Sequence, residues 1–252
     1  MPSPDVLIRG GTVIDGTGAA GERADVAVVG DRIASVGHAE ERSEEIRAGR
    51  VIDATGHVVC PGFVDMHTHS DLQILANPDH LAKVAQGITL EVLGQDGLSY
   101  APVDDATLSR LRAQLRGWND DPDGFDWNWR TVGEYLDRLD AGISANAAYL
   151  VPHGTVRMLV IGEEDRPATD PELERMRSLV ADGMEAGAVG LSSGLTYTPG
   201  MTPPTGSSSS CAAWRPATAG TTARITATTA PTPSRRTARA STSRGRLASG
   251  CT

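Results

Sequence analysis

Several features that would place a protein in a special class are scarce in this 252-residue chain. Aromatic residues make up 4% of it, and no stretch approaches the roughly 20 consecutive apolar residues that a membrane-spanning helix requires. The three cysteines, Cys60, Cys211 and Cys251, are widely spaced, which does not suggest a disulfide framework or a zinc knuckle. The first residues show neither the basic stretch nor the apolar run of an export signal. We therefore expect a soluble, cytoplasmic protein without a membrane partner.

Acidic residues are missing from the last part of the chain. All 32 of them lie at or before Glu185, whereas residues 202–252 hold seven arginines and no lysine. Apart from alanine, Ile225 and Leu247 are the only aliphatic residues of this tail, so it can bury too little apolar surface to offset the entropy of ordering. A basic tail could bind nucleic acid, but this one has no amphipathic stretch to present its charge. We expect no nucleic-acid partner.

The rest of the chain divides into two patterns. Short β-branched runs at 6–14, 25–36 and 51–59, separated by Gly, Asp and charged turns, predict a small layer of antiparallel strands. From Pro61 onward, strands and helices alternate, which is typical of parallel βαβ units. The predicted strands are 62–66, 88–93, 144–151 and 187–192, and the predicted helices are 78–86, 104–117, 131–141, one after 151, and 171–186. About four such units make half of an eightfold barrel.

The helix predicted at 171–186 has the clearest signals. Asp170 is a suitable N-cap, Pro171 suits the first helical position, and an apolar stripe runs from Leu173 to Met184 through Met176 and Val180.

The sharpest chemical feature is the sequence His67-Thr68-His69 directly after a predicted buried strand that begins at Pro61. Alternate side chains of a strand point to the same side, and at the carboxyl end of a barrel strand that side faces the mouth. Two imidazoles would then converge on one point, which suits Zn²⁺ or a similar divalent metal, with Asp65 or Asp71 available to orient a ring. The alternative is a pair of surface or hydrogen-bonded histidines.

Four segments together resemble a known family. Residues 51–71, with Pro61-Gly62-Phe63-Val64-Asp65 and His67-Thr68-His69, are similar to the entry to the barrel in the amidohydrolase superfamily. Residues 87–102, 152–157 and 190–200 resemble the N-acyl-D-amino-acid deacylases, also called D-aminoacylases. The resemblance covers most of residues 5–201 and none of the tail. It implies an α/β protein with a (β/α)8 TIM-like barrel of the metal-dependent hydrolase type and a small N-terminal β-sandwich.

The resemblance also implies a division of the chain and an activity. Residues 1–60 would be the β-sandwich portion, 61–201 the first half of the barrel, and 202–252 a disordered tail. One or two zinc ions would activate a water molecule for attack on the linear amide of an N-acyl-D-amino acid, assisted by a carboxylate from the last strand. The alternatives are a cyclic-amide hydrolase of the hydantoinase or dihydroorotase kind, and a non-catalytic fragment with a basic tail.

The resemblance assigns further roles by position. Family members commonly have a metal-binding cysteine in an Asn-Cys-Gly turn after the second strand, where this chain has Gln95-Asp96-Gly97. Asp96 could still ligate zinc, or could simply cap the turn. Tyr197, His153 and Arg157 are candidates for binding the substrate carboxylate, with structural packing as the alternative for each.

The family's remaining metal ligands and its catalytic Asp from the eighth strand would follow residue 201. This chain has no histidine beyond His153 and no acid beyond Glu185. A reading-frame shift after Met201 would explain the tail, since a chain with one lysine and 22 arginines indicates a GC-rich gene whose out-of-frame translation favours Ala, Arg, Pro, Ser and Thr. We therefore expect an incomplete active site and negligible activity from this chain.

Overall fold

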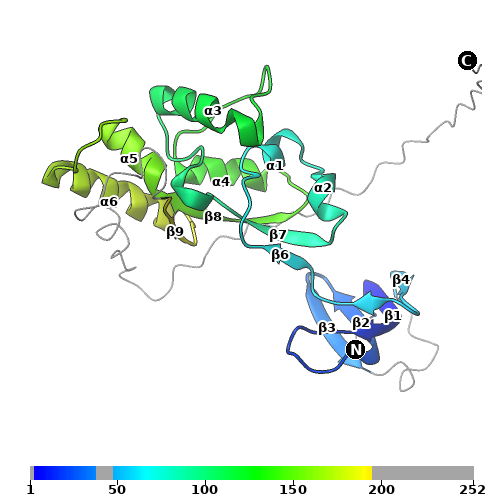
Figure 1. The fold of residues 1–252 in the computed structure, drawn as a ribbon. Coiled ribbons are helices and arrows are strands. Elements are labelled where there is room, and N and C mark those ends of the chain that lie inside the picture. Colours follow the sequence, from blue (N-terminus) through cyan, green and yellow to red (C-terminus); the bar gives the residue numbers. More distant parts are fainter. Residues whose placement is uncertain (1–2, 38–47, 195–252) are drawn as a thin grey trace, which may run out of the picture.

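The structure, a computed structural model, describes residues 3–37 and 48–194. These residues form a small β-layer followed by a larger α/β part, which are distinct in Figure 1. Tyr197 and the tail from Thr202 lie outside the described residues.

The β-layer is one five-stranded sheet. Its strands run in the order β3-β2-β1-β4, and the short β5 also pairs with β1. Their bounds are β1 (Val6–Val13), β2 (Glu22–Val29), β3 (Arg32–Gly37), β4 (Arg50–Asp53) and β5 (Val58–Val59).

The antiparallel prediction is correct for only part of this layer. The β1–β2 and β2–β3 pairs are antiparallel, but β4 and β5 run parallel to β1, so that part of the prediction was wrong. The two residues between β2 and β3 suffice to reverse the chain, whereas parallel strands such as β1 and β4 need a longer connection between them. The predicted strand 25–36 is interrupted at Gly30, which has a φ of 59°.

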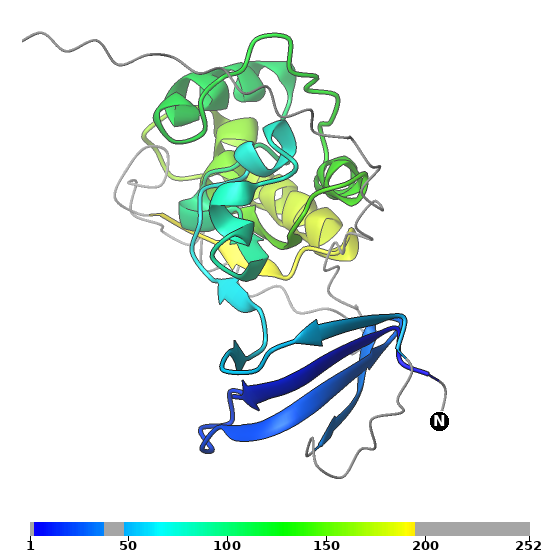
Figure 2. The ribbon, with the colours of Figure 1, turned by 90° about the vertical axis from the view of Figure 1, so that its right-hand side faces the viewer.

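The α/β part contains four parallel strands in the order β6-β7-β8-β9, as the alternating pattern predicted. In Figures 1 and 2 the helices gather beside this curled sheet, and the β-layer lies beyond β6. The elements in chain order are β6 (Phe63–Asp65), α1 (Gln73–Ala76), α2 (Leu81–Val84), β7 (Ile88–Leu93), the 3-10 turn η1 (Gln95–Gly97), α3 (Asp105–Asn119), α4 (Val132–Asp140), β8 (Asn146–Pro152), α5 (His153–Ile161), α6 (Asp170–Glu185) and β9 (Gly190–Ser192).

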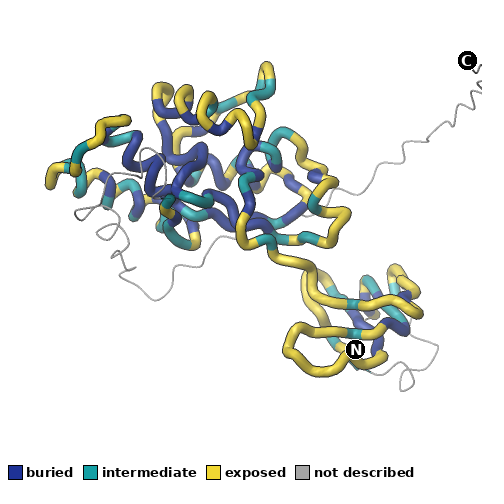
Figure 3. Tube along the Cα trace, in the orientation of Figure 1, coloured by how far each residue is buried: buried dark blue, intermediate teal, exposed yellow. Residues whose placement is uncertain are grey.

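The main core lies between the central strands and the helices, where Figure 3 shows the continuous buried stretches. Leu93, Tyr149 and Val151 of the sheet are fully buried in one apolar cluster with side chains of α3, α4 and α6. The hydroxyls of Tyr135 and Tyr149 and the indole N–H of Trp129 donate to backbone carbonyls, as Tyr149 Oη does to Ala101 O at 2.6 Å. Burial of this apolar area is what holds the helices against the strands.

Local capping explains where α3, α4 and α6 begin. The Asp104 side chain accepts a hydrogen bond from the Thr107 N–H at 2.7 Å at the start of α3, a contact of a type that contributes about 1 kcal/mol. Two helix predictions need correction. The N-cap of α6 is Thr169 rather than Asp170, because Glu172 accepts hydrogen bonds from both the Thr169 N–H and its hydroxyl. The helix predicted over 78–86 is confined to α2, since His80 before it has a left-handed φ of 40°.

Candidate metal centre

Two of the predicted ligands lie at the carboxyl end of β6. His67 and His69 occupy the irregular segment that follows the strand, so strand alternation was the wrong reason for their convergence. Their rings nevertheless lie close together, with centroids 5.4 Å apart and planes inclined by 78°. This edge-on arrangement leaves the Nε2 atoms of both rings directed toward one carboxylate.

That carboxylate belongs to Asp96, in the turn that follows β7. Asp96 Oδ2 lies 3.3 Å from His67 Nε2 and 3.2 Å from His69 Nε2. Among the described residues, these three form the one group of His, Cys, Asp or Glu whose ligand atoms all lie within 4.8 Å of one another. The sequence-based choice of metal ligands therefore corresponds to a real cluster.

The turn that carries Asp96 is built from positive-φ residues. Gly94, Asp96 and Gly97 have φ angles of 75°, 55° and 75°. A Cβ atom on Gly94 would lie 2.1 Å from the carbonyl oxygen of Leu150 in β8, so the turn can pack against that strand only with glycine there. The glycine turn that the capping alternative required is present, but the side chain of Asp96 faces the two histidines.

Buried polar groups hold this turn from two sides. Asp71 Oδ1 accepts hydrogen bonds from the Gly94 N–H at 2.7 Å and from the Ser99 hydroxyl at 2.6 Å. On the other side, the Ser192 hydroxyl accepts from the Gly97 N–H at 3.0 Å and donates to the Gly94 carbonyl. Burial raises the pKa of the Asp71 carboxyl, although the hydrogen bonds from Ser99 and Gly94 oppose this shift.

Asp71 and Asp65 thus act on the backbone rather than on the histidine rings. Asp65 accepts a hydrogen bond from the His67 N–H at 3.3 Å, and its carboxylate also receives the amine of Lys83. The hydrogen bond from Lys83 keeps the pKa of Asp65 below its ordinary value. Both carboxylates therefore hold segments that carry ligands.

The donor set fits zinc. Two imidazole nitrogens and one carboxylate oxygen are ordinary Zn²⁺ ligands, and bonds of about 2.0–2.1 Å at tetrahedral angles place neighbouring ligand atoms roughly 3.3 Å apart. The distances from Asp96 Oδ2 to the two Nε2 atoms, 3.3 and 3.2 Å, match that edge length. An ion bound here would need at least one further ligand, from water or from another part of the protein.

A cleft of about 780 Å³ opens beside His69. Trp118, at the end of α3, stacks on the His69 ring with centroids 4.3 Å apart while 51% of its own surface remains exposed. The walls of the cleft also include apolar side chains of α1 and α2, among them Ala76 and Leu81. The cleft thus joins an apolar surface to the metal centre.

Comparison with known proteins decides the family. The sequence profile of the amidohydrolase family matches residues 50–240, which include all three residues of the cluster. The chain belongs to the amidohydrolase family. The match also runs beyond Met201 into the tail, further than the resemblance read from the sequence motifs.

Several of the relatives are described as deacylases. The chain is 39% identical over 196 residues to D-aminoacylase and 38% identical over 202 residues to N-acyl-D-aspartate deacylase, both of Alcaligenes xylosoxydans xylosoxydans. These matches cover 77% and 80% of this chain but 38% and 39% of those proteins, so the chain spans about two fifths of the length of the curated relatives it matches.

Solved structures agree with these matches. The fold resembles the crystal structure of D-aminoacylase with a TM-score of 0.66 and 39% identity, over 79% of this chain and 40% of that one. It resembles N-acyl-D-glutamate deacylase from Bordetella bronchiseptica, solved with zinc and a phosphonate inhibitor, with a TM-score of 0.67 and 36% identity over the same shares. The family resemblance predicted from sequence is confirmed. The helices within the described residues are too short or too polar to cross a membrane.

The structure describes two of the three proposed carboxylate-binding residues, His153 and Arg157. His153 begins α5 and is 3% exposed, and burial together with the Arg157 charge lowers its pKa to about 4. Arg157 is also buried, and its guanidinium donates to the backbone carbonyls of Glu164 and Arg166. These contacts favour the structural alternative for Arg157. Neither ring nitrogen of His153 has a hydrogen-bond partner among the described residues, and Tyr197 lies outside them.

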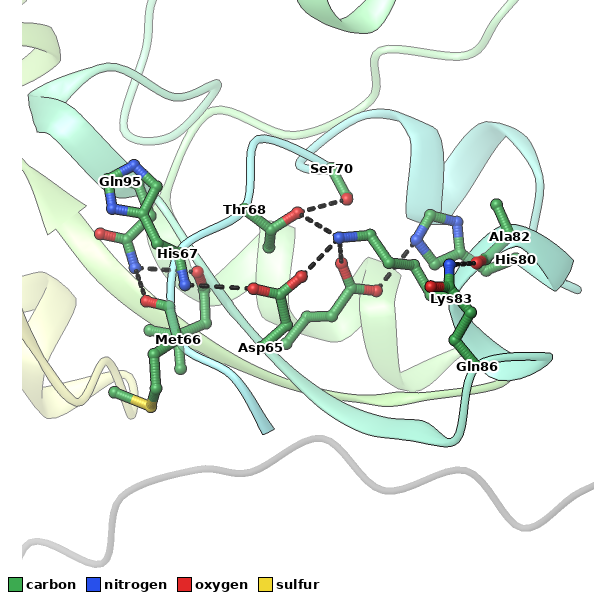
Figure 4. Close-up of polar contacts among 12 residues, drawn as sticks. Asp65, Met66, His67, Thr68, Ser70, His80, Ala82, Lys83, Gln86 and Gln95 are labelled. Atoms are coloured by element: carbon green, nitrogen blue, oxygen red, sulfur yellow. Dashed lines mark hydrogen bonds and ion pairs between the residues drawn. The ribbon is translucent and has the colours of Figure 1, made fainter. Parts of the chain in front are cut away.

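Sequence reasoning missed two residues beside the metal centre. Trp118 gave no signal, because its contact with His69 joins positions far apart in the chain. Lys83 did stand out as the single lysine, but only as an indication of gene composition. Its contacts with the segment between the histidines are visible in Figure 4.

Proposed function

We propose that this chain is part of a zinc-dependent hydrolase that cleaves the linear amide of N-acyl-D-amino acids. The observation that carries the proposal is the cluster of His67, His69 and Asp96, in which the carboxylate oxygen lies at tetrahedral zinc-ligand spacing from both imidazole nitrogens. The substrate class is supported by relatives described as D-aminoacylase and as deacylases of N-acyl-D-aspartate and N-acyl-D-glutamate.

A metal ion bound here would supply Lewis-acid activation of water and of the amide carbonyl. The protein's own residues provide the geometry. The backbone of the turn that carries Asp96 is held at Gly94 and Gly97, which presents its carboxylate to both imidazoles. The cleft beside His69 and Trp118 gives the apolar part of an acylated amino acid a surface close to the ion.

The organisation of the complete enzyme is part of the same proposal. Residues 1–60 would belong to a β-sandwich and 61–201 to the first half of a (β/α)8 barrel in a cytoplasmic enzyme. Residues 202–252 contain no histidine and no acid, so they cannot supply the further imidazole ligands or the eighth-strand carboxylate that the family resemblance implies. We interpret them as a tail read out of frame, and we expect negligible hydrolysis by the chain as it stands.

The test compares the 252-residue chain with a version in which the reading frame after Met201 is restored. Both are assayed for bound zinc and for hydrolysis of N-acyl-D-amino acids, hydantoins and dihydropyrimidines. We expect zinc in both and turnover of N-acyl-D-amino acids by the restored version alone. Turnover of only the cyclic amides would refute the substrate class, and equal specific activity of the two versions would refute the interpretation of the tail.

A further inference from the structure

Lys83 occupies an unusual position, because it is the only lysine of the chain and its amine is shared by three segments. From the short helix α2 it reaches the Asp65 carboxylate at the end of β6 and the Thr68 hydroxyl at 3.1 Å. Its Nζ also lies 3.6 Å from Glu91 Oε2 on β7. Figure 4 shows the amine between these groups.

Thr68 makes this contact relevant to the metal centre. It is the residue between His67 and His69, in a segment that belongs to no strand or helix. Its hydroxyl contacts Lys83 Nζ and lies 2.7 Å from the Ser70 hydroxyl. Side-chain contacts of this kind therefore take the place of sheet hydrogen bonds in fixing the backbone that presents the two imidazoles.

Because of the charges around Lys83, removing its amine would destabilise the segment 65–69 in particular. Asp65 and Glu91 are register partners on adjacent parallel strands, and Glu91 is fully buried. His80 Nε2 lies 2.9 Å from Glu91 Oε1, which leaves Lys83 as the cation that Asp65 contacts. Without the amine, two carboxylates would share a partly buried site with one imidazole, and Asp65 would be pushed away from Glu91.

Asp65 cannot move without moving a ligand. Its other carboxylate oxygen accepts the hydrogen bond from the His67 N–H, so a displaced Asp65 pulls on the backbone of the first ligand. The contact with Thr68 acts on the same segment one residue later. Both effects disturb the spacing of His67 Nε2 and His69 Nε2 about Asp96.

We propose that Lys83 is a positioning residue for the metal centre, which fixes the segment 65–69 so that both histidines meet Asp96 at ligand spacing. This inference rests on the metal site proposed above. Lys83 would thus act on the metal centre from α2 through Asp65 and Thr68, because its amine contacts none of the three ligands.

The experiment measures zinc affinity of the full 252-residue chain by competition with a chromogenic chelator, together with the visible absorption of bound Co²⁺. Lys83→Met should weaken zinc binding by about 10- to 100-fold, the usual effect of losing a group that orients metal ligands. Lys83→Arg, which keeps the cation, should recover most of that loss. Gln86→Ala is the matched control, because Gln86 lies just beyond α2 and its amide donates only to the Ala82 carbonyl.

A purely structural role for Lys83 would lower the melting temperature without changing the Co²⁺ spectrum of the folded protein, and that result would overturn the proposal. Equal weakening by Gln86→Ala would overturn it as well. If Lys83→Met fails to fold, Thr68→Val removes the contact without leaving unpaired charge, and it should weaken zinc binding by about threefold. Unchanged affinity in that variant would count against the proposal.

The metal site itself is checked separately with His67→Ala. Zinc binding that is lost in His67→Ala but unaffected in folded Lys83→Met would leave the site intact and refute only the role of Lys83. Absence of zinc binding by the unaltered chain would refute both.

Discussion

Replacing Gly94 with alanine should damage both stability and the metal centre, because the turn that carries Asp96 tolerates no side chain at its first position. Gly94 has a φ of 75°, and a Cβ atom there would lie 2.1 Å from the Leu150 carbonyl oxygen. That oxygen belongs to the backbone of β8 and cannot rotate away. The turn or the strand must therefore shift, and Asp96 shifts with it.

The expected magnitude has two parts. An alanine held at positive φ costs about 1–2 kcal/mol relative to glycine. The clash with a backbone atom adds about 1–3 kcal/mol, the usual range for inserting a group into a well-packed site. Gly124 separates these parts, since it has a φ of 70° but a Cβ atom there would have nothing within 4 Å. Gly124→Ala should therefore show only the first cost.

The assay is urea denaturation followed by circular dichroism, with zinc affinity measured on the same samples by chelator competition. We expect Gly94→Ala to lower the free energy of unfolding by more than Gly124→Ala and to weaken zinc binding, while Gly124→Ala leaves zinc binding unchanged. Equal free energies of unfolding for the two variants would show that β8 does not restrict the turn. Unchanged zinc affinity in folded Gly94→Ala would show that the turn does not fix Asp96.

Three further results are expected. Asp96→Ala should weaken zinc binding by more than about 100-fold, since loss of an orienting group alone costs about 10- to 100-fold. Asp96→Cys should bind zinc more tightly than the unaltered chain, because a thiolate is a stronger zinc ligand than a carboxylate. Chelator competition measures both affinities, and values equal to that of the unaltered chain would contradict these expectations. Cu²⁺ binding should quench the fluorescence of Trp118, whose ring lies 4.3 Å from that of His69, and the same quenching in Trp118→Phe would exclude this contact. The pKa of His153 is about 4 in the fold and about 6.5 when unfolded, so the unfolded state binds more protons between these values and stability should fall by about 3 kcal/mol as pH drops from 6.5 to 4. Urea denaturation across this range should show a smaller decrease in His153→Gln, and an identical decrease would assign the effect to other groups.

The sequence predicted well those features that depend on neighbouring residues. The alternation of apolar strands and amphipathic helices predicted β6, β7 and β8 within one or two residues, because burial of one face imposes that period. The two histidines were also predicted to converge, but β6 is largely exposed rather than buried and both histidines lie beyond it, so strand alternation does not explain their convergence. Asp96 could be named only through its place in the family motif, and the structure then brought it to both rings.

Features that depend on contacts between distant residues could not be predicted. The parallel pairing of β4 with β1 depends on the path of the chain between them, which local propensity does not encode. His69 lies in the irregular segment after β6 and Trp118 near the end of α3. Packing of the core, rather than local sequence, brings these two side chains together. The clamp on the Asp96 turn likewise needs Ser192, which follows it by almost a hundred residues.

A strand added at the exposed edge of the sheet would couple metal binding to strand pairing. Among the described strands, β6 pairs only with β7, and its residues Phe63 and Val64 are 57% and 49% exposed. The two histidines follow directly from this strand, so any strand that joins β6 in parallel would end beside them. A ligand on that strand would bind the ion only when the strand is paired. By thermodynamic linkage, zinc would then strengthen strand addition at this edge by the same factor as strand addition strengthens zinc binding.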